Sequence, residues 1–148
     1  MKILVCADGS ETSKKALEKT AEIGANLENA EITVIHVYQA AYATSAQPRG
    51  VGYVPNIEIS PEYSKQLQRN GTDILEHAAK TFKKYNIQVT TVLKEGPPAP
   101  TIIDYAAEKK FDLIVVGNRG LSGISKVFLG SVSNGILHGT NACVLIVK

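Results

Sequence analysis

The sequence has no tryptophan, one methionine and two cysteines among 148 residues. Cys6 and Cys143 both lie in strongly apolar segments, where a free cysteine behaves as a small core hydrophobe. There is no CxxC pair and no histidine-rich cluster, which disfavours a metal site or a redox-active dithiol. We therefore expect both thiols to be packing residues.

Charge of one sign is also scarce. The formal net charge is +2, and basic pairs such as Lys83-Lys84 are isolated. Proteins that bind nucleic acids or anionic membranes need a basic patch, so the sequence predicts neither partner. No stretch is long and apolar enough to cross a bilayer, and the apolar run at residues 3–7 is too short for a signal peptide. We expect a cytosolic protein.

Five apolar runs alternate with helical patterns along the chain. Strands are predicted at residues 3–7, 31–37, 87–93, 111–116 and 142–147. Alternation of strands and helices predicts an α/β fold with three layers, a mostly parallel sheet covered by helices on both faces. If the sheet winds outward both ways from the first strand, its order is 3-2-1-4-5. A chain of 148 residues fits a single domain.

Serines mark two predicted helix starts. Ser10 follows the first strand, and Ser60 precedes a proline at the first helical position. Further helices are predicted near residues 100–109 and 131–138. Gly71 interrupts the apolar stripe of the helix after Ser60, at a cost of about 1 kcal/mol relative to alanine. Residues 38–60 show no periodicity, and we expect a mobile loop there.

A glycine-rich stretch follows the fourth predicted strand. Gly117 and Gly120 come directly after that strand, and Gly130-Ser131 opens the last helix. Glycines allow backbone N–H groups to approach an anion closely. A helix start adds unpaired N–H donors and a positive dipole end. A lone pair of glycines would be explained by the shape of the loop alone. Several spaced glycines between a strand and a helix start favour a phosphate cradle instead.

Polar side chains complete the predicted site. Ser133 adds a hydroxyl donor, and Arg119 and Lys126 supply positive charge. Asp8 ends the first strand and is an acceptor suited to ribose hydroxyls. In a sheet of order 3-2-1-4-5 the ends of strands one and four flank the reversal of winding, where ligands bind. The sequence predicts a site for a phosphate-bearing ribose ligand, a nucleotide, between these strands.

Two common nucleotide motifs are missing. The sequence has no G-x-x-x-x-G-K-[ST], so the lysine and metal geometry of P-loop ATPases is absent. No G-x-G-x-x-G follows the first strand, which disfavours a dinucleotide-dependent dehydrogenase.

The spacing Gly117-x2-Gly120-x9-Gly130-Ser131 resembles the G-x2-G-x9-G-[ST] signature of the ATP-binding branch of the universal stress proteins. The segments ILVCADGS, IHVY and CVLIVK resemble the first, second and last strands of that family, so the resemblance covers the whole chain. It implies one universal stress protein domain over residues 1–148, with the Rossmann-like fold of the adenine nucleotide alpha hydrolases. It also implies an ATP-binding regulator of the stress response.

The resemblance also implies roles for single residues. Asp8 would hydrogen-bond ribose, Ala7 and Val37 would line the adenine slot, and Gly130 and Ser131 would bind phosphates through backbone N–H groups. The residues expected to contact the nucleotide are Ala7, Asp8, Val37, Val116, Gly117, Arg119, Gly120, Gly130, Ser131, Val132 and Ser133. The family dimerises through its last strand, so residues 142–147 would pair with a second copy, which would cover an apolar sheet edge.

Three functions stay open: a dimeric ATP sensor, a slow ATP hydrolase, and a module that binds AMP or cyclic AMP. Hydrolysis needs a positioned water and charge neutralisation at the γ-phosphate. Asp8 is assigned to ribose and His36, His77 and His138 are scattered, so we predict no catalytic residue. The sequence offers no carboxylate set for a metal, so any Mg²⁺ would depend on phosphates and water. The sequence identifies no downstream protein partner.

Overall fold

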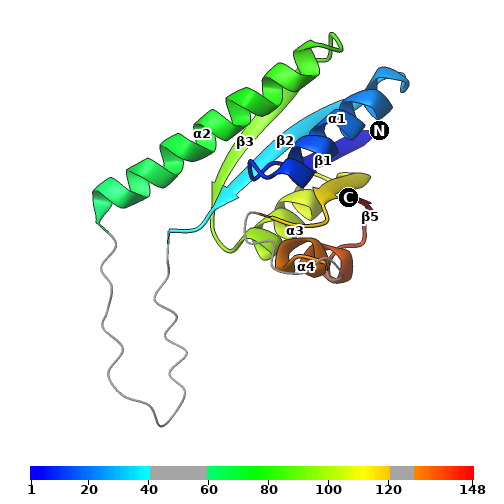
Figure 1. The fold of residues 1–148 in the computed structure, drawn as a ribbon. Helices are drawn as coiled ribbons and strands as arrows, with labels where there is room; N and C mark the ends of the chain where they lie inside the picture. Colours follow the sequence, from blue (N-terminus) through cyan, green and yellow to red (C-terminus); the bar gives the residue numbers. More distant parts are fainter. Residues whose placement is uncertain (41–59, 121–128) are drawn as a thin grey trace.

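Residues 1–40, 60–120 and 129–148 are described by the computed structural model of the chain (Figure 1). Residues 41–59 of the predicted mobile loop, and Lys126, lie outside these ranges. The described residues form a five-stranded sheet with the order β3-β2-β1-β4-β5. Neighbouring strands all run parallel. The parallel sheet and the strand order predicted from the sequence are therefore confirmed.

The elements lie close to their predicted positions. The strands are β1 (Lys2–Cys6), β2 (Glu31–Tyr38), β3 (Val89–Glu95), β4 (Leu113–Gly117) and β5 (Cys143–Val147). The helices are α1 (Glu11–Ala25), α2 (Pro61–Lys83), α3 (Pro98–Glu108) and α4 (Ser131–Gly139). Helix α3 begins two residues earlier than predicted, because a proline is well suited to the first turn of a helix.

Side chains of β1 alternate between two cores. Ile3 and Val5 pack with residues of α1 and α2, whereas Leu4 and Cys6 pack with residues of α3 and α4. Successive side chains of a strand point to opposite faces, so one central strand supplies both cores. Helices α1 and α2 therefore cover one face of the sheet, and α3 and α4 cover the other (Figure 1).

Serine caps position the first two helices as predicted. The side chain of Ser10 accepts a hydrogen bond from the backbone N–H of Ser13, and Ser60 accepts one from Tyr63. Each cap satisfies a backbone donor that the first turn of a helix leaves unpaired.

Three large apolar side chains near the ends of helices α1 and α2 are exposed. Leu27 follows the end of α1 and is 36% exposed, and Tyr85 follows the end of α2 and is 39% exposed. Tyr63 is 54% exposed in the first turn of α2, whose buried residues begin only at Gly71. The apolar pattern of the sequence therefore continues past the part of each helix that packs against the sheet.

Phe82 is the largest fully buried side chain among the described residues, and its removal tests the core beneath α2. We expect Phe82→Ala to lower the free energy of unfolding by about 3–5 kcal/mol, because it leaves a cavity as well as losing buried apolar area. Tyr85→Ala is the matched control, with an expected change within about 0.5 kcal/mol at this exposed position. Urea denaturation followed by circular dichroism measures both. Equal losses for the two variants would contradict the packing described for α2.

Candidate functional site

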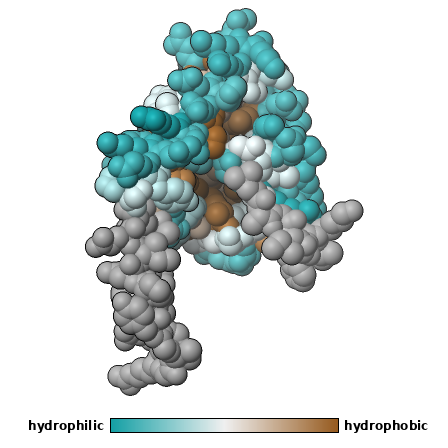
Figure 2. Space-filling model, turned by 60° about the vertical axis from the view of Figure 1, so that its left-hand side comes forward, coloured by the Kyte–Doolittle hydropathy of each residue, from teal (hydrophilic) through white to brown (hydrophobic). Residues whose placement is uncertain are grey.

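A cavity of about 290 Å³ opens where β1 and β4 end. It lies at the point where the sheet order reverses, which is the usual ligand site of such sheets. The eleven residues that were expected to contact the nucleotide all lie on its wall. The lining residues are Cys6, Ala7, Asp8, Ser13, Ile35, Val37, Pro98, Ile102, Val116, Gly117, Arg119, Gly120, Gly130, Ser131, Val132 and Ser133. Figure 2 shows the molecule with the left-hand side of Figure 1 turned forward. Hydrophobic residues lie there in hollows between hydrophilic surfaces.

One wall of the cavity is apolar. Ile35 and Val37 lie two residues apart on β2 and so face the same side of the sheet. Val116 of β4 and Ile102 of α3 are almost completely buried beside them. A slot with aliphatic walls and a polar end suits a flat heterocycle that carries a polar substituent.

Five of the lining residues were not predicted from the sequence. Cys6 was assigned to the core alone, and Ser13 and Ile35 were given no ligand role, although the period of two along β2 places Ile35 beside Val37. Pro98 and Ile102 reach the cavity because α3 crosses the sheet near the end of β2. No local sequence pattern fixes where a helix crosses a sheet, so their role needed the structure.

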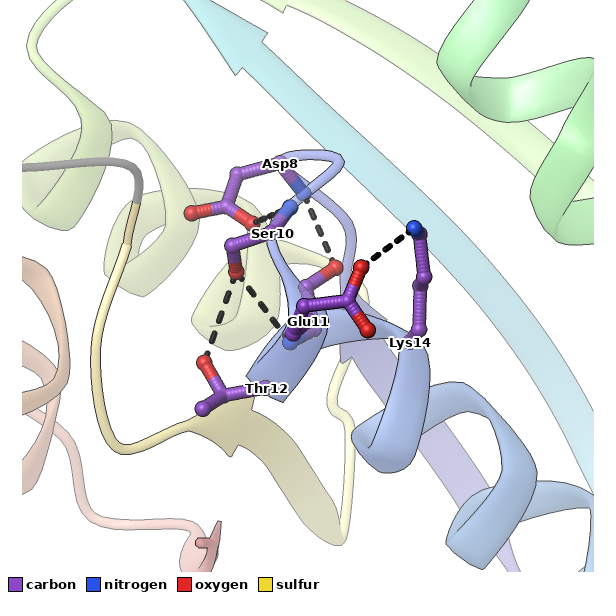
Figure 3. Close-up of polar contacts among 6 residues, drawn as sticks. Asp8, Ser10, Glu11, Thr12 and Lys14 are labelled. Atoms are coloured by element: carbon purple, nitrogen blue, oxygen red, sulfur yellow. Dashed lines mark hydrogen bonds and ion pairs between the residues drawn. The ribbon is translucent and has the colours of Figure 1, made fainter.

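Asp8 is held in a tight turn at the end of β1 (Figure 3). Its Oδ1 accepts a hydrogen bond of 2.9 Å from the backbone N–H of Ser10. Its own backbone N–H donates to Oγ of Ser13 at 3.1 Å. A Cβ added to Gly120 would lie 2.8 Å from the Oδ2 of Asp8. Glycine at position 120 therefore leaves room for the Asp8 carboxylate at the cavity.

The start of α1 packs tightly against the end of β4. The hydroxyl of Thr12 donates a hydrogen bond of 2.6 Å to the carbonyl oxygen of Arg119. A Cβ added to Gly117 would lie 2.7 Å from the Thr12 Oγ1 and 2.9 Å from the Thr12 carbonyl carbon. Glycine at position 117 is therefore required by the contact between α1 and β4, whatever ligand is present.

The first turn of α4 differs from those of α1 and α2. Its N-cap residue is Gly130, and no side chain among the described residues caps it. The first intrahelical bond runs from Asn134 N–H to the Gly130 carbonyl oxygen. The preceding N–H groups, those of residues 131–133, have no hydrogen-bond partner in the described part of the chain. Unpaired N–H groups and the positive end of the helix dipole are features that suit an anion at this end of the cavity.

Gly130 itself is not required by the fold. Its φ of −64° and ψ of 158° are open to any residue. A Cβ there would meet its nearest described neighbours, Arg119 Cα and the Asn118 carbonyl oxygen, at 3.4 Å, which is an acceptable contact distance. Nothing in the described residues demands glycine at position 130, which contrasts with the close contacts at Gly117 and Gly120.

A buried guanidinium nitrogen lies at the same end of the cavity. Nε of Arg119 is buried and has no hydrogen-bond partner among the described residues. A buried donor without an acceptor costs free energy, and Arg119 is also one of the residues that line the cavity. The hydroxyl of Ser133 donates instead to carbonyl oxygens of Asn118 and Gly130, at 3.2 and 3.0 Å. Ser133 thus supports the loop, and its hydroxyl proton is already used.

The Cys6 thiol has low reactivity. Burial, and secondarily the charge of Asp8, raise the pKa of Cys6 to about 12. The thiol therefore stays protonated at neutral pH and is a poor nucleophile.

The described residues contain no group of three or more His, Cys, Asp or Glu side chains that would hold a metal ion. None of the described helices is both long and apolar enough to cross a membrane.

The chain is similar to known proteins over its whole length. The family model of the universal stress proteins matches residues 1–148. The universal stress protein YxiE of Bacillus subtilis is 37% identical over 147 residues, which cover 99% of this chain and 98% of YxiE.

Two solved structures share the fold. The structure of protein MJ0577, from Methanocaldococcus jannaschii, superimposes with a TM-score of 0.81 at 25% identity and covers 99% of this chain and 94% of its own. A universal stress protein in complex with cAMP superimposes with a TM-score of 0.71 at 26% identity, covering 100% of this chain and 97% of its own. The chain belongs to the universal stress protein family.

Proposed function

We propose that this chain binds an adenine nucleotide in the cavity between β1 and β4, with ATP as the ligand, and acts as a dimeric nucleotide sensor in the cytoplasm. The observation that carries the proposal is the uncapped start of α4, which leaves the N–H groups of residues 131–133 without described partners beside an apolar slot. A nucleotide combines a flat base with an anionic tail, and the two ends of the cavity match these parts.

The proposed pose follows from the two ends. The base lies in the apolar slot against Ala7, Val37 and Val116. Ribose lies at Asp8, whose Oδ2 faces Gly120. The phosphates lie against Gly120, the start of α4 from Gly130 to Ser133, and Arg119. Gly117 lies against α1, which occupies the space that a side chain at this position would need.

A monophosphate ligand is the second candidate, and the solved relative in complex with cAMP supports it. Three N–H groups at a helix start can donate hydrogen bonds to a single phosphate or to the terminal phosphate of a triphosphate. Slow hydrolysis of ATP is a third candidate. The ionisable residues among the described lining are Cys6, Asp8 and Arg119, and a thiol with a pKa of about 12 is not a general base near pH 7. Mg²⁺ would be held mainly by phosphates and water.

The nucleotide content of the purified protein separates these candidates. Denaturation releases bound ligand, and ion-exchange chromatography identifies it. ATP at close to one per chain supports the sensor and makes fast hydrolysis untenable. AMP or cyclic AMP would favour the monophosphate module, and ADP would favour the hydrolase. If the protein is empty, titration with ATP, AMP and cyclic AMP follows, and absence of binding to all three would refute the proposal.

Gly130 provides a direct test of the phosphate end. We expect Gly130→Val to lower ATP affinity at least about tenfold, as expected for the loss of a hydrogen bond to a charged group, because its side chain takes phosphate space. The variant should fold, since the backbone angles at position 130 suit valine. Isothermal titration calorimetry measures affinity. Asn134→Val is the control, an exposed position of the same helix turn. Equal affinity for folded Gly130→Val and wild type would remove the phosphate assignment.

The dimer is proposed to form through β5, which pairs on one side with β4. Cys143 N–H donates to the Asp112 carbonyl oxygen, and the Val147 carbonyl oxygen accepts from Asn118 N–H. Residues 143 and 147 therefore bond toward β4. In a parallel pair, alternate residues point their backbone groups to opposite sides, so Val144 presents its N–H outward, where a second copy would pair.

Proline at position 144 should separate the copies. Val144→Pro removes an outward N–H and leaves the bonds from residues 143 and 147 to β4 in place. We expect wild type and the Val144→Thr control to elute as dimers, and Val144→Pro as a folded monomer. Size-exclusion chromatography with light scattering measures the mass. A wild-type monomer at micromolar concentration, or a dimeric proline variant, would refute pairing through β5.

A further inference from the structure

His36 touches the candidate site from behind. It lies on β2 and is not among the residues that line the cavity. Its Nδ1 is 2.6 Å from the carbonyl oxygen of Ala7, the last residue before Asp8. A carbonyl oxygen can only accept a hydrogen bond, so Nδ1 carries the proton and donates it. No local sequence pattern indicates this contact, because the two residues are 29 positions apart.

The peptide unit between Ala7 and Asp8 is held from both sides. His36 binds its carbonyl oxygen, and the Ser13 Oγ accepts from its N–H at 3.1 Å. Both groups belong to one planar unit, so the two bonds fix its rotation. The N–H of Ala7 donates to the Ile35 carbonyl oxygen at 2.9 Å. The direction in which Asp8 leaves β1 is therefore set by neighbouring elements before any ligand binds.

Gly71 of α2 makes the space for the imidazole. A Cβ on Gly71 would lie 2.8 Å from Cδ2 of His36 and 2.6 Å from Cδ1 of Leu93. Glycine inside a helix costs about 1 kcal/mol relative to alanine, and the helical backbone at this position does not need it. Close packing of α2 against β2 and β3 explains the residue. The imidazole is thus confined between Gly71 on one side and the Ala7 carbonyl on the other.

We propose that His36 is a positioning residue for the nucleotide, which aims the Asp8 carboxylate at the ribose hydroxyls through the Ala7–Asp8 peptide. Gly71 is the second part of this device, since it seats the imidazole. The inference rests on the proposed function, because it requires Asp8 to contact ribose. It predicts that a change on the far side of the sheet selectively weakens recognition of the sugar.

The test compares ATP with 2′,3′-dideoxy-ATP, which lacks both ribose hydroxyls. We expect His36→Leu to weaken ATP binding about tenfold, the range of one hydrogen bond to a charged group, with little change for the dideoxy ligand. His36→Asn should restore ATP binding, because its amide nitrogen can occupy the place of Nδ1. His36→Gln is the matched control, since its amide nitrogen corresponds to Nε2 and does not reach the Ala7 carbonyl. The pair of amide variants keeps the test valid if His36→Leu fails to fold.

A double-mutant cycle with Asp8→Ala completes the experiment. Asp8→Ala should weaken ATP binding, and adding His36→Gln to it should cause no further loss, because the two residues act through one contact. Equal loss of both ligands in His36→Gln, or full additivity with Asp8→Ala, would overturn the positioning role. Wild type that binds neither ligand would instead refute the proposed function. Wild type that binds both ligands equally would refute the ribose contact at Asp8.

Discussion

Burial of β1 on both faces, from Ile3 to Cys6, is the constraint on which the rest of the structure depends. Ile3, Leu4 and Val5 have no exposed surface, and each such side chain contributes about 1.5–3 kcal/mol on burial. A strand buried on both faces and flanked on both edges must end where polar residues begin. That point is Asp8, and it coincides with the reversal of the sheet order. The core therefore decides where the cavity lies, and the cavity residues inherit their positions from the core.

Glycine is present at the three positions of the motif for different physical reasons, although the motif itself does not distinguish them. At Gly117 the first turn of α1 fills the space that a side chain would need, and at Gly120 the Asp8 carboxylate fills it. Gly130 is opposed by no described atom closer than 3.4 Å. The first two build the site, and the third leaves space beside unpaired N–H groups. A spaced glycine motif can thus combine requirements of the fold with requirements of a ligand.

Much of this architecture was predictable, for reasons that lie in the local sequence. Buried strands, serine caps and the order of the sheet follow from apolar runs, N-cap chemistry and the right-handed crossover rule. The ends of apolar stripes were not predictable, as Tyr63 and Tyr85 show, because burial depends on how far a helix overlaps the sheet. The contacts of Ile102 and His36 were also hidden. Each depends on which element crosses which strand, and that is fixed only when the chain is folded.

Asn118 gives the proposed sensor a physical connection between its two ends. Its N–H donates to the Val147 carbonyl oxygen at 2.7 Å, and its carbonyl oxygen accepts from the Gly130 N–H at 2.8 Å. One residue therefore joins the last residue of β5 to the N-cap of α4. A ligand changes a distant equilibrium only through contacts that differ between two states. The start of α4 is thus bonded to a residue that also holds the outer strand of the sheet, and an anion bound there as proposed would act next to that residue.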